Sequence, residues 1–581
     1  MLKTIINKNT YQDSVVLMLL TNEISALEGV NRVSIMMGTP ANKDIFINSG
    51  FDTPELEEAT ANDMVIVIDA ESEEVVENAL EHIDEFLKSQ AESTDEKTDR
   101  VIRNWEGALM ELPDANLAVI SVPGAYAASV ANRALDEDLN VFIFSDNVDI
   151  EDEVRLKKKA KEKGLLCMGP DSGTGIINGI PIAFTNNIRT GKIGIVGASG
   201  TGIQEVTTII DRLGGGVSNA IGTGGRDLSE EVGGITMLSA IATLAEDDDT
   251  DVITIISKPP AERVRNNVMN YLRSLDKPVV TIFLGEKPKH HEENLYQAYT
   301  LEEAAKLSVQ LMRNEDIKAF RTESRFGAEE VEGKIIKGYY SGGTLAEEAA
   351  MLIKDALGLD KEREEEKGFM LKYNGFEIID LGDDQYTQGR PHPMIDPAIR
   401  AEYLERAQEE LPDVILFDIV LGYGAHDNMA AALAPSIKKL KEEAKRQGKE
   451  LYFVTSLCGT DKDPQGYDKQ KEILEGLGVI VCETNNQAVE KSLALVGKTL
   501  KYYEKKVRPK EKVTEKIKVK VSNSMKGLIT RSPKIINIGL KSFAETLDSF
   551  PCEVVQYDWR PVAGGDVEMM KILDFLRNYQ F

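Results

Sequence analysis

The sequence has 581 residues, of which 42% are hydrophobic, so it is long enough to form about three to five domains with buried cores. It carries 68 basic and 97 acidic residues, and its net charge of −29 disfavours binding to nucleic acid or to anionic membrane surfaces. Four cysteines without CxxC spacing, together with the lack of a leader-like or membrane-length apolar run, predict a cytoplasmic protein with reduced thiols.

The first 90 residues alternate strand-like and helix-like segments. Apolar strands are predicted over residues 33–38 and 64–69, and a helix with one apolar face is predicted over residues 73–87. This β-α-β-α-β order predicts a small ferredoxin-like α+β domain at residues 1–90. The polar run SQAESTDEKTDR follows it, and we expect a linker over residues 91–115.

From residue 116 onward, continuous apolar strands alternate with helix-length segments. This pattern is typical of parallel sheets that are covered by helices on both faces. A basic and polar stretch near the carboxyl end, residues 501–520, is predicted to be another linker. The predicted units are a truncated Rossmann-like domain at 116–188, flavodoxin-like domains at 189–325 and 331–505, and a short tail at 521–581.

The strongest local signal is the segment KIGIVGASGTGIQEV at residues 192–206, in which an apolar strand runs through glycines into a helix. Glycines let the backbone approach a ligand, and the unpaired amides of a helix start favour a phosphate or a carboxylate. Ser199, Gly200 and Thr201 are therefore predicted to bind phosphate. The lysine of a Walker P-loop is missing, and the alternative is a tight strand-to-helix turn without a ligand.

A second glycine-rich segment is AIGTGGRDLSEEVGG at residues 220–234. Arg226 follows three glycines, and a guanidinium beside flexible backbone suits bidentate binding of an oxyanion. The alternative is that Arg226 and Asp227 only stabilise the loop. The residues predicted to bind phosphate here are Gly222, Thr223, Gly224 and Gly225.

Three further segments repeat the pattern of a strand, glycines and a helix. MGPDSGTGIING, residues 168–179, is predicted to be a substrate-binding or CoA-like loop. FDIVLGYGAHDNMA, residues 417–430, and YYSGGTLAEEA, residues 339–349, are predicted to form similar helix starts in the last α/β domain. The candidate binding residues are Pro170, Asp171, Ser172 and Gly173 in the first segment, and Gly422 and Gly424 in the second.

The histidines differ in their surroundings. His392 and His426 follow strands beside proline or glycine, which is the side of a parallel sheet where sites form, and both are candidate general acids or bases. His290 and His291 lie in the charged segment EKPKHHEENL and are predicted to be solvated. No Cys/His spacing predicts a metal site, and no GxSxG segment predicts a hydrolase.

Several of these motifs resemble a known superfamily. GPDSGTGIIN, GKIGIVGASGT and IGTGGRD resemble the α chain of succinyl-CoA synthetase, and YSGGTLAEEA and VILFDIVLGYGAHDN resemble the carboxy-terminal domain of its β chain. YQDSVVLMLL, SIMMGTPANKD, GASGTGIQEVT, GTGGRDLSEEVGG and ISKPPA resemble the FdrA family more closely, over roughly residues 1–500. Residues 534–566 resemble the start of the protein usually encoded beside FdrA, so the tail is expected to be a docking segment or part of a fusion.

The chain also departs from succinyl-CoA synthetase. EKPKHHEENLYQAYTLEEAA stands where that enzyme has its phosphohistidine loop, and the first domain replaces the amino-terminal strand and turn that hold CoA. No ATP-grasp domain is identified. Glu205 matches the glutamate that contacts the phosphohistidine in the synthetases.

The resemblance therefore implies a phosphate-linked carbamoyl or acyl transferase. The best candidate is oxamate carbamoyltransferase, which converts oxalurate and phosphate to oxamate and carbamoyl phosphate in purine (allantoin) catabolism. Phosphate would be a co-substrate, Arg226 would clamp an oxyanion, Glu205, His392 and His426 would be catalytic, and no cofactor would be required, with CoA or a nucleotide disfavoured. Partner proteins encoded in the same operon and an oligomeric state are expected. The alternatives are an NDP-forming acyl-CoA synthetase and a non-catalytic scaffold subunit.

Overall fold

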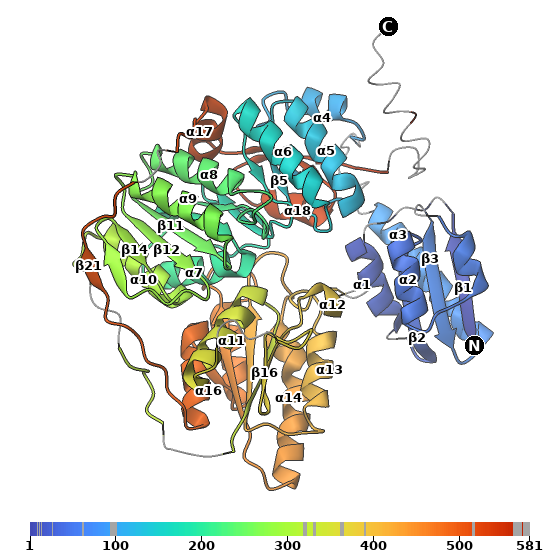
Figure 1. The fold of residues 1–581 in the computed structure, drawn as a ribbon. Coiled ribbons are helices and arrows are strands. Elements are labelled where there is room, and N and C mark those ends of the chain that lie inside the picture. Colours follow the sequence, from blue (N-terminus) through green and yellow to red (C-terminus); the bar gives the residue numbers. More distant parts are fainter. Residues whose placement is uncertain are drawn as a thin grey trace.

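The computed structural model describes residues 1–92 apart from 9, 11, 13, 26, 61 and 62, and then residues 102–317, 322–328, 333–360, 365–387, 391–513, 517–561 and 572. In these residues the chain forms four sheets, which we call sheets A to D (Figure 1). Sheets B, C and D are mainly parallel and carry helices on their faces, so the expectation of a mixed α/β protein with parallel sheets is confirmed.

Sheet A forms a small unit at the amino terminus, seen at the right of Figure 1. The strand β3 lies between β1 and β2 and is antiparallel to both, which is the arrangement of a split β-α-β unit and confirms the predicted ferredoxin-like fold. Its sequence MVIVIDA is continuously apolar up to Asp69 because both faces of this central strand are covered. The elements are β1 (Leu2–Asn7), α1 (Ser14–Ser25), β2 (Val30–Met37), α2 (Pro40–Asn48), η1 (Pro54–Glu58), β3 (Met64–Ala70) and α3 (Glu73–Glu92).

Sheet B combines two segments that are far apart in the sequence. Its strand order is β23-β22-β4-β5-β6, and all its strands are parallel. The first segment contributes α4 (Trp105–Glu111), β4 (Leu117–Ile120), α5 (Gly124–Asp136), β5 (Asn140–Ile143), α6 (Ile150–Lys163) and β6 (Cys167–Met168). The carboxy-terminal segment contributes α17 (Asn523–Thr530), β22 (Lys534–Ile538), α18 (Lys541–Leu547) and β23 (Glu553–Tyr557).

Sheet C has nine strands in the order β21-β13-β14-β12-β11-β9-β10-β7-β8. Its parallel part is formed by β9, β10, β11, β12 and β14. The elements are β7 (Thr174–Ile177), β8 (Ile180–Ala183), β9 (Thr190–Ala198), α7 (Gly200–Arg212), β10 (Val217–Gly222), α8 (Ile235–Ala245), β11 (Val252–Ser257), α9 (Glu262–Arg273), β12 (Val279–Phe283), β13 (His290–Glu292), β14 (Leu295–Gln297), α10 (Leu301–Met312) and β21 (Lys506–Arg508).

Sheet D has six strands in the order β16-β17-β15-β18-β19-β20, and all but β16 are parallel. The elements are β15 (Ile336–Tyr340), α11 (Gly343–Leu357), β16 (Leu371–Tyr373), β17 (Phe376–Asp380), α12 (Asp384–Thr387), α13 (Ala398–Arg406), β18 (Val414–Val420), α14 (Met429–Arg446), β19 (Tyr452–Cys458), α15 (Tyr467–Gly476), β20 (Ile480–Cys482) and α16 (Asn485–Leu495).

The structure corrects the predicted boundaries in four places. The predicted linker at 91–115 contains α4, and the predicted linker at 501–520 contains β21, which pairs with β13 at the edge of sheet C. The hairpin of β7 and β8 lies in sheet C, although it falls within the predicted Rossmann-like unit at 116–188. The tail at 521–581 is not a separate unit, because its strands complete sheet B. These pairings are made over long sequence separations, which local patterns do not encode.

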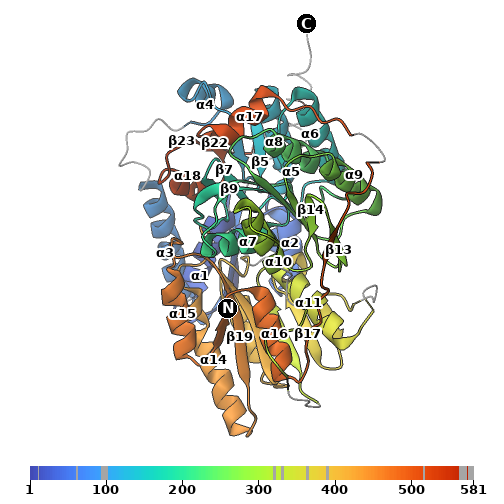
Figure 2. The same ribbon diagram turned by 90° about the vertical axis from the view of Figure 1, so that its left-hand side faces the viewer.

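The parallel strands of sheets B, C and D share one spatial order. In sheets C and D the first strand of the parallel unit lies between the second and the third, which gives the order 2-1-3-4-5 of flavodoxin-like folds, and sheet B has the same order when β22 and β23 are counted before β4. Such sheets bind ligands outside the carboxyl ends of their strands, where the order reverses. In Figures 1 and 2, the first helices of the units of sheets C and D, α7 and α11, lie on opposite sides of the junction between the upper and lower halves of the molecule.

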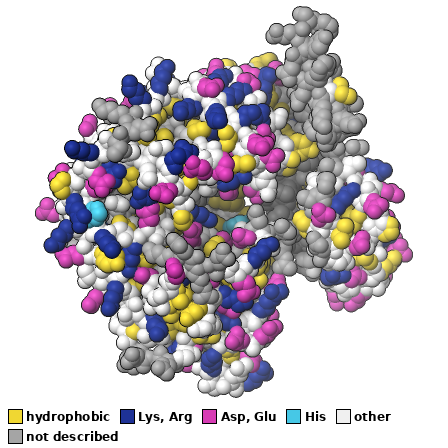
Figure 3. Space-filling view, in the orientation of Figure 1, with side chains coloured by type: hydrophobic (Ala, Val, Ile, Leu, Met, Phe, Trp, Pro, Cys, Tyr) yellow, Lys and Arg dark blue, Asp and Glu magenta, His cyan; other side chains and the backbone are white. Residues whose placement is uncertain are grey.

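No helix in the described part of the chain is both long and apolar enough to span a membrane. The face in Figure 3 carries acidic and basic side chains interspersed with one another.

Candidate functional site

The starts of two helices meet between sheets C and D. Ser199 caps α7 by accepting a hydrogen bond from the amide of Gly202 at 3.1 Å. The hydroxyl oxygens of Ser199 and Thr344 lie 2.6 Å apart, and the amide of Thr344 donates to the Thr201 hydroxyl at 3.3 Å. Since each helix start presents unpaired amides and a partial positive charge, two adjacent starts form a stronger site for an anion than either one alone.

The same two helices hold the halves of the molecule together through a matched pair of glutamates. Glu205 on α7 accepts a hydrogen bond at 2.9 Å from the amide of Asn485, the first residue of α16. Glu348 on α11 accepts one at 2.7 Å from the amide of Leu301, the first residue of α10. Each glutamate is the sixth residue of its helix and caps a helix of the other half, so the arrangement is pseudo-symmetric.

Burial is the largest influence on the pKa of both glutamates. Desolvation raises the pKa of Glu205 above its ordinary value and raises that of Glu348 to about 8. Both side chains are almost fully inaccessible to solvent. The predicted catalytic role of Glu205 therefore does not fit its position, because its carboxylate is committed to a helix cap in the interior.

The amides that precede α11 are already occupied by a carboxylate. Asp418, at the interior of β18, accepts from the amides of Ser341 and Gly342 at 2.8 and 2.7 Å. The buried guanidinium of Arg400 contacts both the backbone and the side chain of Asp418. Asp418 thus fixes the loop between β15 and α11, and an incoming anion would bind further along, at Gly343.

Lys258 supplies a cation beside these helix starts. It follows β11, its side chain is 45% exposed, and its ammonium lies 3.8 Å from the carboxylate of Glu347 on α11. It also acts electrostatically on Asp380, the last residue of β17. An accessible lysine next to two helix starts is the local feature that an anionic substrate needs on a chain with a net charge of −29.

Asp380 lies against the start of α11. A side chain at Gly343 would place its Cβ atom 2.5 Å from Asp380 Oδ2, so glycine is required for this close approach. Asp380 is only 8% exposed, and burial raises its pKa to about 7. It is therefore a carboxyl group that can both hold and release a proton near neutral pH, as a general acid or base must.

His392 belongs to the same cluster. A Cβ atom at Gly382 would lie 2.7 Å from His392 Nε2 and 3.1 Å from Asp380 Oδ1, so both side chains flank one backbone position. Desolvation lowers the pKa of His392 to about 4, and its Nδ1 accepts a hydrogen bond from the amide of Met394. His392 is therefore a neutral ring at pH 7 with its proton on Nε2, able to donate a hydrogen bond.

The second glycine-rich segment follows β10 beside the end of β9, and its arginine makes structural contacts. Arg226 pairs with Glu153 at 2.9 Å and donates to the carbonyl of Val148 at 2.7 Å, so its guanidinium is engaged within the loop. The predicted role of Arg226 as an oxyanion clamp gains no support from these contacts and stays a prediction. The alternative weighed from the sequence, a loop-stabilising pair, agrees with the contacts, because Asp227 accepts hydrogen bonds from the amides of Thr236 and Met237 at the start of α8.

The glycines of this segment allow close packing against the predicted substrate loop. A Cβ atom at Gly224 would lie 2.1 Å from the carbonyl of Pro170, and one at Gly222 would lie 2.4 Å from the Ser172 hydroxyl. A Cβ atom at Gly225 would likewise lie close to the carboxylate of Asp171. The carbonyl of Thr223 accepts a hydrogen bond from Lys157. Of the predicted loop, Gly173 comes within 4.0 Å of a Cβ atom built on Gly200, so it lies beside the start of α7.

The loop after β18 packs against the other half of the molecule. A Cβ atom at Gly422 would lie 2.8 Å from the carbonyl of Thr185, and one at Gly424 would lie 2.0 Å from the ring of Phe184. These glycines accommodate an interface between domains, which leaves no room for a phosphate at the same positions. In the same loop, Nδ1 of His426 accepts a hydrogen bond from the amide of Asn428 at the start of α14, which is a capping role.

Sequence reasoning thus found one side of the site and missed the other. Ser199, Gly200 and Thr201 lie together as predicted, and His392 lies in the adjacent cluster. Lys258 and Asp380 were missed, although each lies at the carboxyl end of an apolar strand, where site residues collect in parallel sheets. In the described residues, no group of three or more His, Cys, Asp or Glu side chains has the arrangement of a metal site.

Three family models match parts of the chain. Residues 1–102 match a domain described as "AllF, heavy metal-associated domain", residues 188–285 match a CoA binding domain, and residues 339–495 match a CoA-ligase domain. Residues 1–102 contain no cysteine, so thiolate binding of a metal is excluded for this stretch.

Individual proteins match the chain over different lengths. The uncharacterised protein YahF of Escherichia coli (strain K12) is 41% identical over 498 residues, which cover 83% of this chain and 96% of YahF. The α subunit 2 of an ADP-forming succinate–CoA ligase of Archaeoglobus fulgidus is 27% identical over 177 residues, 30% of this chain and 60% of that subunit. The apo form of a dinucleotide-forming acetyl-coenzyme A synthetase of Ca. Korarchaeum cryptofilum covers 66% of this chain and 83% of its own, with 14% identity and a TM-score of 0.27.

Proposed function

The chain belongs to the FdrA family, and we propose that it transfers a carbamoyl or acyl group to or from phosphate at the junction of α7 and α11. The preferred reaction is the phosphorolysis of oxalurate to oxamate and carbamoyl phosphate. The fold is that of acyl-CoA synthetases and succinate–CoA ligases, which handle acyl and phosphoryl groups.

The observation that carries the proposal is the meeting of the two helix starts beside Lys258 and Asp380. The accessible backbone there belongs to Gly200, Thr201 and Gly343, whose amides would bind phosphate oxygens. The Lys258 ammonium would neutralise part of the phosphate charge. No covalent intermediate on the protein is needed, since positioning and oxyanion stabilisation supply the catalysis.

In this reaction a phosphate oxygen attacks the carbamoyl carbon of oxalurate, and the bond from that carbon to the amide nitrogen breaks. The departing nitrogen must gain a proton to leave as oxamate. Asp380, whose pKa of about 7 keeps it partly protonated at neutral pH, would donate that proton. The neutral His392 would donate a hydrogen bond to an oxygen that develops negative charge.

The histidines at 290 and 291 support a mechanism without a phosphohistidine. Both lie in β13, and three strands of sheet C separate β13 from β9, which leads into α7. Burial lowers the pKa of His291 to about 4, and its Nδ1 accepts a hydrogen bond from the amide of Gln297. The expectation that both histidines are solvated is wrong for His291, which is buried at the sheet edge.

The proposal is tested by incubating the purified chain with oxalurate and phosphate, alone and together with the proteins encoded beside its gene. We expect carbamoyl phosphate to form, and we expect Lys258→Ala and Asp380→Asn to reduce its formation at least 100-fold in the most active mixture. If no mixture forms carbamoyl phosphate, the transfer reaction is wrong. Complex formation that is unaffected by both substitutions, without turnover, would instead indicate a scaffold subunit.

The second candidate is an NDP-forming acyl-CoA synthetase. The matches to a CoA binding domain and a CoA-ligase domain favour it. It predicts nucleotide consumption that depends on CoA, together with an acid-labile phosphohistidine. Replacing His290 and His291 by Ala would abolish the labelling of the protein by radioactive phosphate.

A further inference from the structure

The carboxy-terminal segment, residues 521–560, supplies two adjacent strands of sheet B, one of which is interior. Its strand β22 lies between β23 and β4, and Ile535 to Ile538 pair in parallel register with Leu117 to Ile120. The strand that follows it, β23, then forms the edge of the sheet. A segment 400 residues away along the chain therefore provides the interior of the domain and is more than an addition to its surface.

In sheet B, β22 occupies the place that the first strand of the parallel unit occupies in sheets C and D. In sheets C and D, the strands that lie between the second and third strands are β9 and β15, and each leads through glycine into a helix. β22 has the same neighbours in sheet B and leads through Gly539 into α18. Gly539 has φ +115°, and a Cβ atom there would lie 2.6 Å from the hydroxyl of Ser121 after β4.

The end of this segment lies beside the point where the rest of the domain begins. The amide of Asp558 donates to the carbonyl of Ile102 at 2.8 Å, and Arg103 pairs with the Asp558 carboxylate at 2.9 Å. The rings of Trp105 and Tyr557 are in edge contact at 5.8 Å. If residues 521–560 preceded residues 102–168 in the chain, the strands of the domain would follow one another without interruption. Only a short connection would be needed to join the two segments.

The segment is held by side chains that are buried on both faces of sheet B. Ile536 and Ile538 join one hydrophobic cluster with α5 and α6, while Ile535 and Leu528 join another with the helices of sheet C. Phe543 makes edge contacts with Phe144 and Phe184, at centroid distances of 5.1 and 6.1 Å. Figure 1 shows both helices in red, with α17 at the upper rim of the molecule and α18 below the blue helices α5 and α6.

We propose that residues 521–560 are the displaced first strand-helix-strand unit of the sheet B domain and that they bind the β4 surface as a separable partner. The covalent connection through the polar residues 509–520 is then not required for binding. The β4 edge and the apolar surfaces around it form an interaction site for one occupant, a strand-helix-strand segment with apolar residues at the positions of Ile535, Ile536 and Ile538.

A protease recognition sequence inserted after Lys518 tests this in the full-length chain. After purification and cleavage, we expect the segment to stay with the body through gel filtration and to separate from it only in denaturant. Release of the segment under native conditions would overturn the proposal, whether the body then stays folded or precipitates.

Matched substitutions give the cleaved protein a second readout. Ile536 is fully buried between β4 and β23, whereas Ser542 is exposed on the same segment. We expect Ile536→Asp to lower the retention of the cleaved segment at least tenfold and Ser542→Asp to leave it unchanged. Equal retention of both variants would show that β22 is not the binding element.

Relocating the segment avoids any dependence on cleavage. Residues 521–560 are moved in front of Ile102, in place of residues 93–101, and the chain then ends at Lys520. We expect this rearranged protein to be monodisperse and to melt within a few degrees of the natural order. Failure of the rearranged chain to fold, when the parent folds under the same conditions, would contradict the proposal.

Discussion

Asp380 is the residue whose chemistry depends most on its surroundings. Between about pH 4 and pH 7 the folded protein holds a proton on Asp380 that the unfolded chain has released. Raising the pH through this window therefore lowers the free energy of unfolding, by on the order of 4 kcal/mol in total. A buried acid of this kind is kept at a cost in stability, which is common at functional sites.

Asp380→Asn removes this titration. We expect the variant to match the stability of the parent near pH 4 and to exceed it increasingly up to pH 8, while losing transfer activity. Urea unfolding of both proteins across this pH range measures the difference. A difference that does not depend on pH would show that Asp380 is ionised throughout.

Lys258 is expected to carry much of the affinity for phosphate. We predict that phosphate raises the melting temperature of the parent and that Lys258→Ala abolishes this shift, because the ligand stabilises only the folded state. Lys192 is a matched control, since its side chain is 43% exposed and it pairs with Asp249. If Lys192→Ala weakens the shift as much as Lys258→Ala, the effect reflects net charge alone.

At the scale of helices and strands, the caps contributed by Glu205 and Glu348 connect the two halves. Glu205→Ala would leave the buried amide of Asn485 without its acceptor. We expect the free energy of unfolding to fall by about 1–3 kcal/mol. Glu475→Ala, at an exposed position of α15, should change it by less than about 0.5 kcal/mol, and urea unfolding distinguishes the two.

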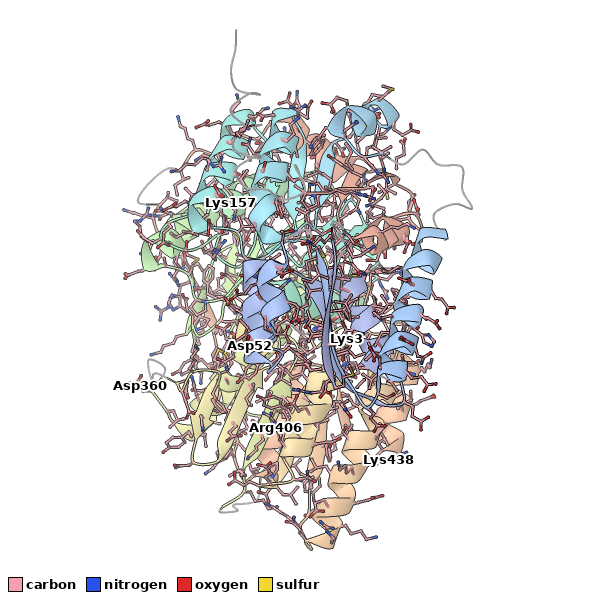
Figure 4. All side chains as sticks on the ribbon, turned by 90° about the vertical axis from the view of Figure 1, so that its right-hand side faces the viewer. Lys3, Asp52, Lys157, Asp360, Arg406 and Lys438 are labelled. Atoms are coloured by element: carbon pink, nitrogen blue, oxygen red, sulfur yellow. The ribbon has the colours of Figure 1, made fainter. Side chains whose placement is uncertain are left out.

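The helix α6 is tied to the loop before α8 by a fully buried lysine, which Figure 4 labels in the upper half of the molecule. Lys157 pairs with Glu153 at 2.9 Å and with Asp227 at 2.7 Å. Lys157→Met would leave Asp227 buried without its cation and Glu153 with Arg226 as its remaining cation, so we expect the free energy of unfolding to fall by about 3–5 kcal/mol. Lys158→Met, one residue away and exposed, provides the control in the same denaturation experiment.

On the scale of the whole molecule, the amino-terminal unit has a core of its own. Its two hydrophobic clusters contain only residues between Ile5 and Leu87. We therefore expect deletion of residues 1–101 to leave the melting transition of the remaining chain unchanged within a few degrees, as followed by calorimetry. A large decrease would show that this unit also stabilises sheets B to D.

Local sequence patterns were enough to predict many of the strands and helices and the glycine-rich helix starts. Apolar periodicity and helix-start chemistry are local properties, so Ser199 to Thr201 and the ferredoxin-like unit could be predicted without a structure. The presence of glycine did not by itself distinguish a phosphate-binding loop from a tightly packed one. At Gly224 and Gly424 the same residue type that suggests a phosphate loop serves close packing between chain segments, and only the neighbouring segments show which applies.

Contacts between distant chain segments set which residues face one another, and local patterns do not predict these contacts. Lys258 follows a strand of sheet C, Asp380 ends a strand of sheet D, and Arg226 is held by Glu153 on another helix. The use of residues 521–560 as two strands of sheet B, one of them interior, is the largest effect of this kind. Strand pairing depends on shape and burial across long sequence separations, and a short apolar strand carries no mark of the sheet that it will complete.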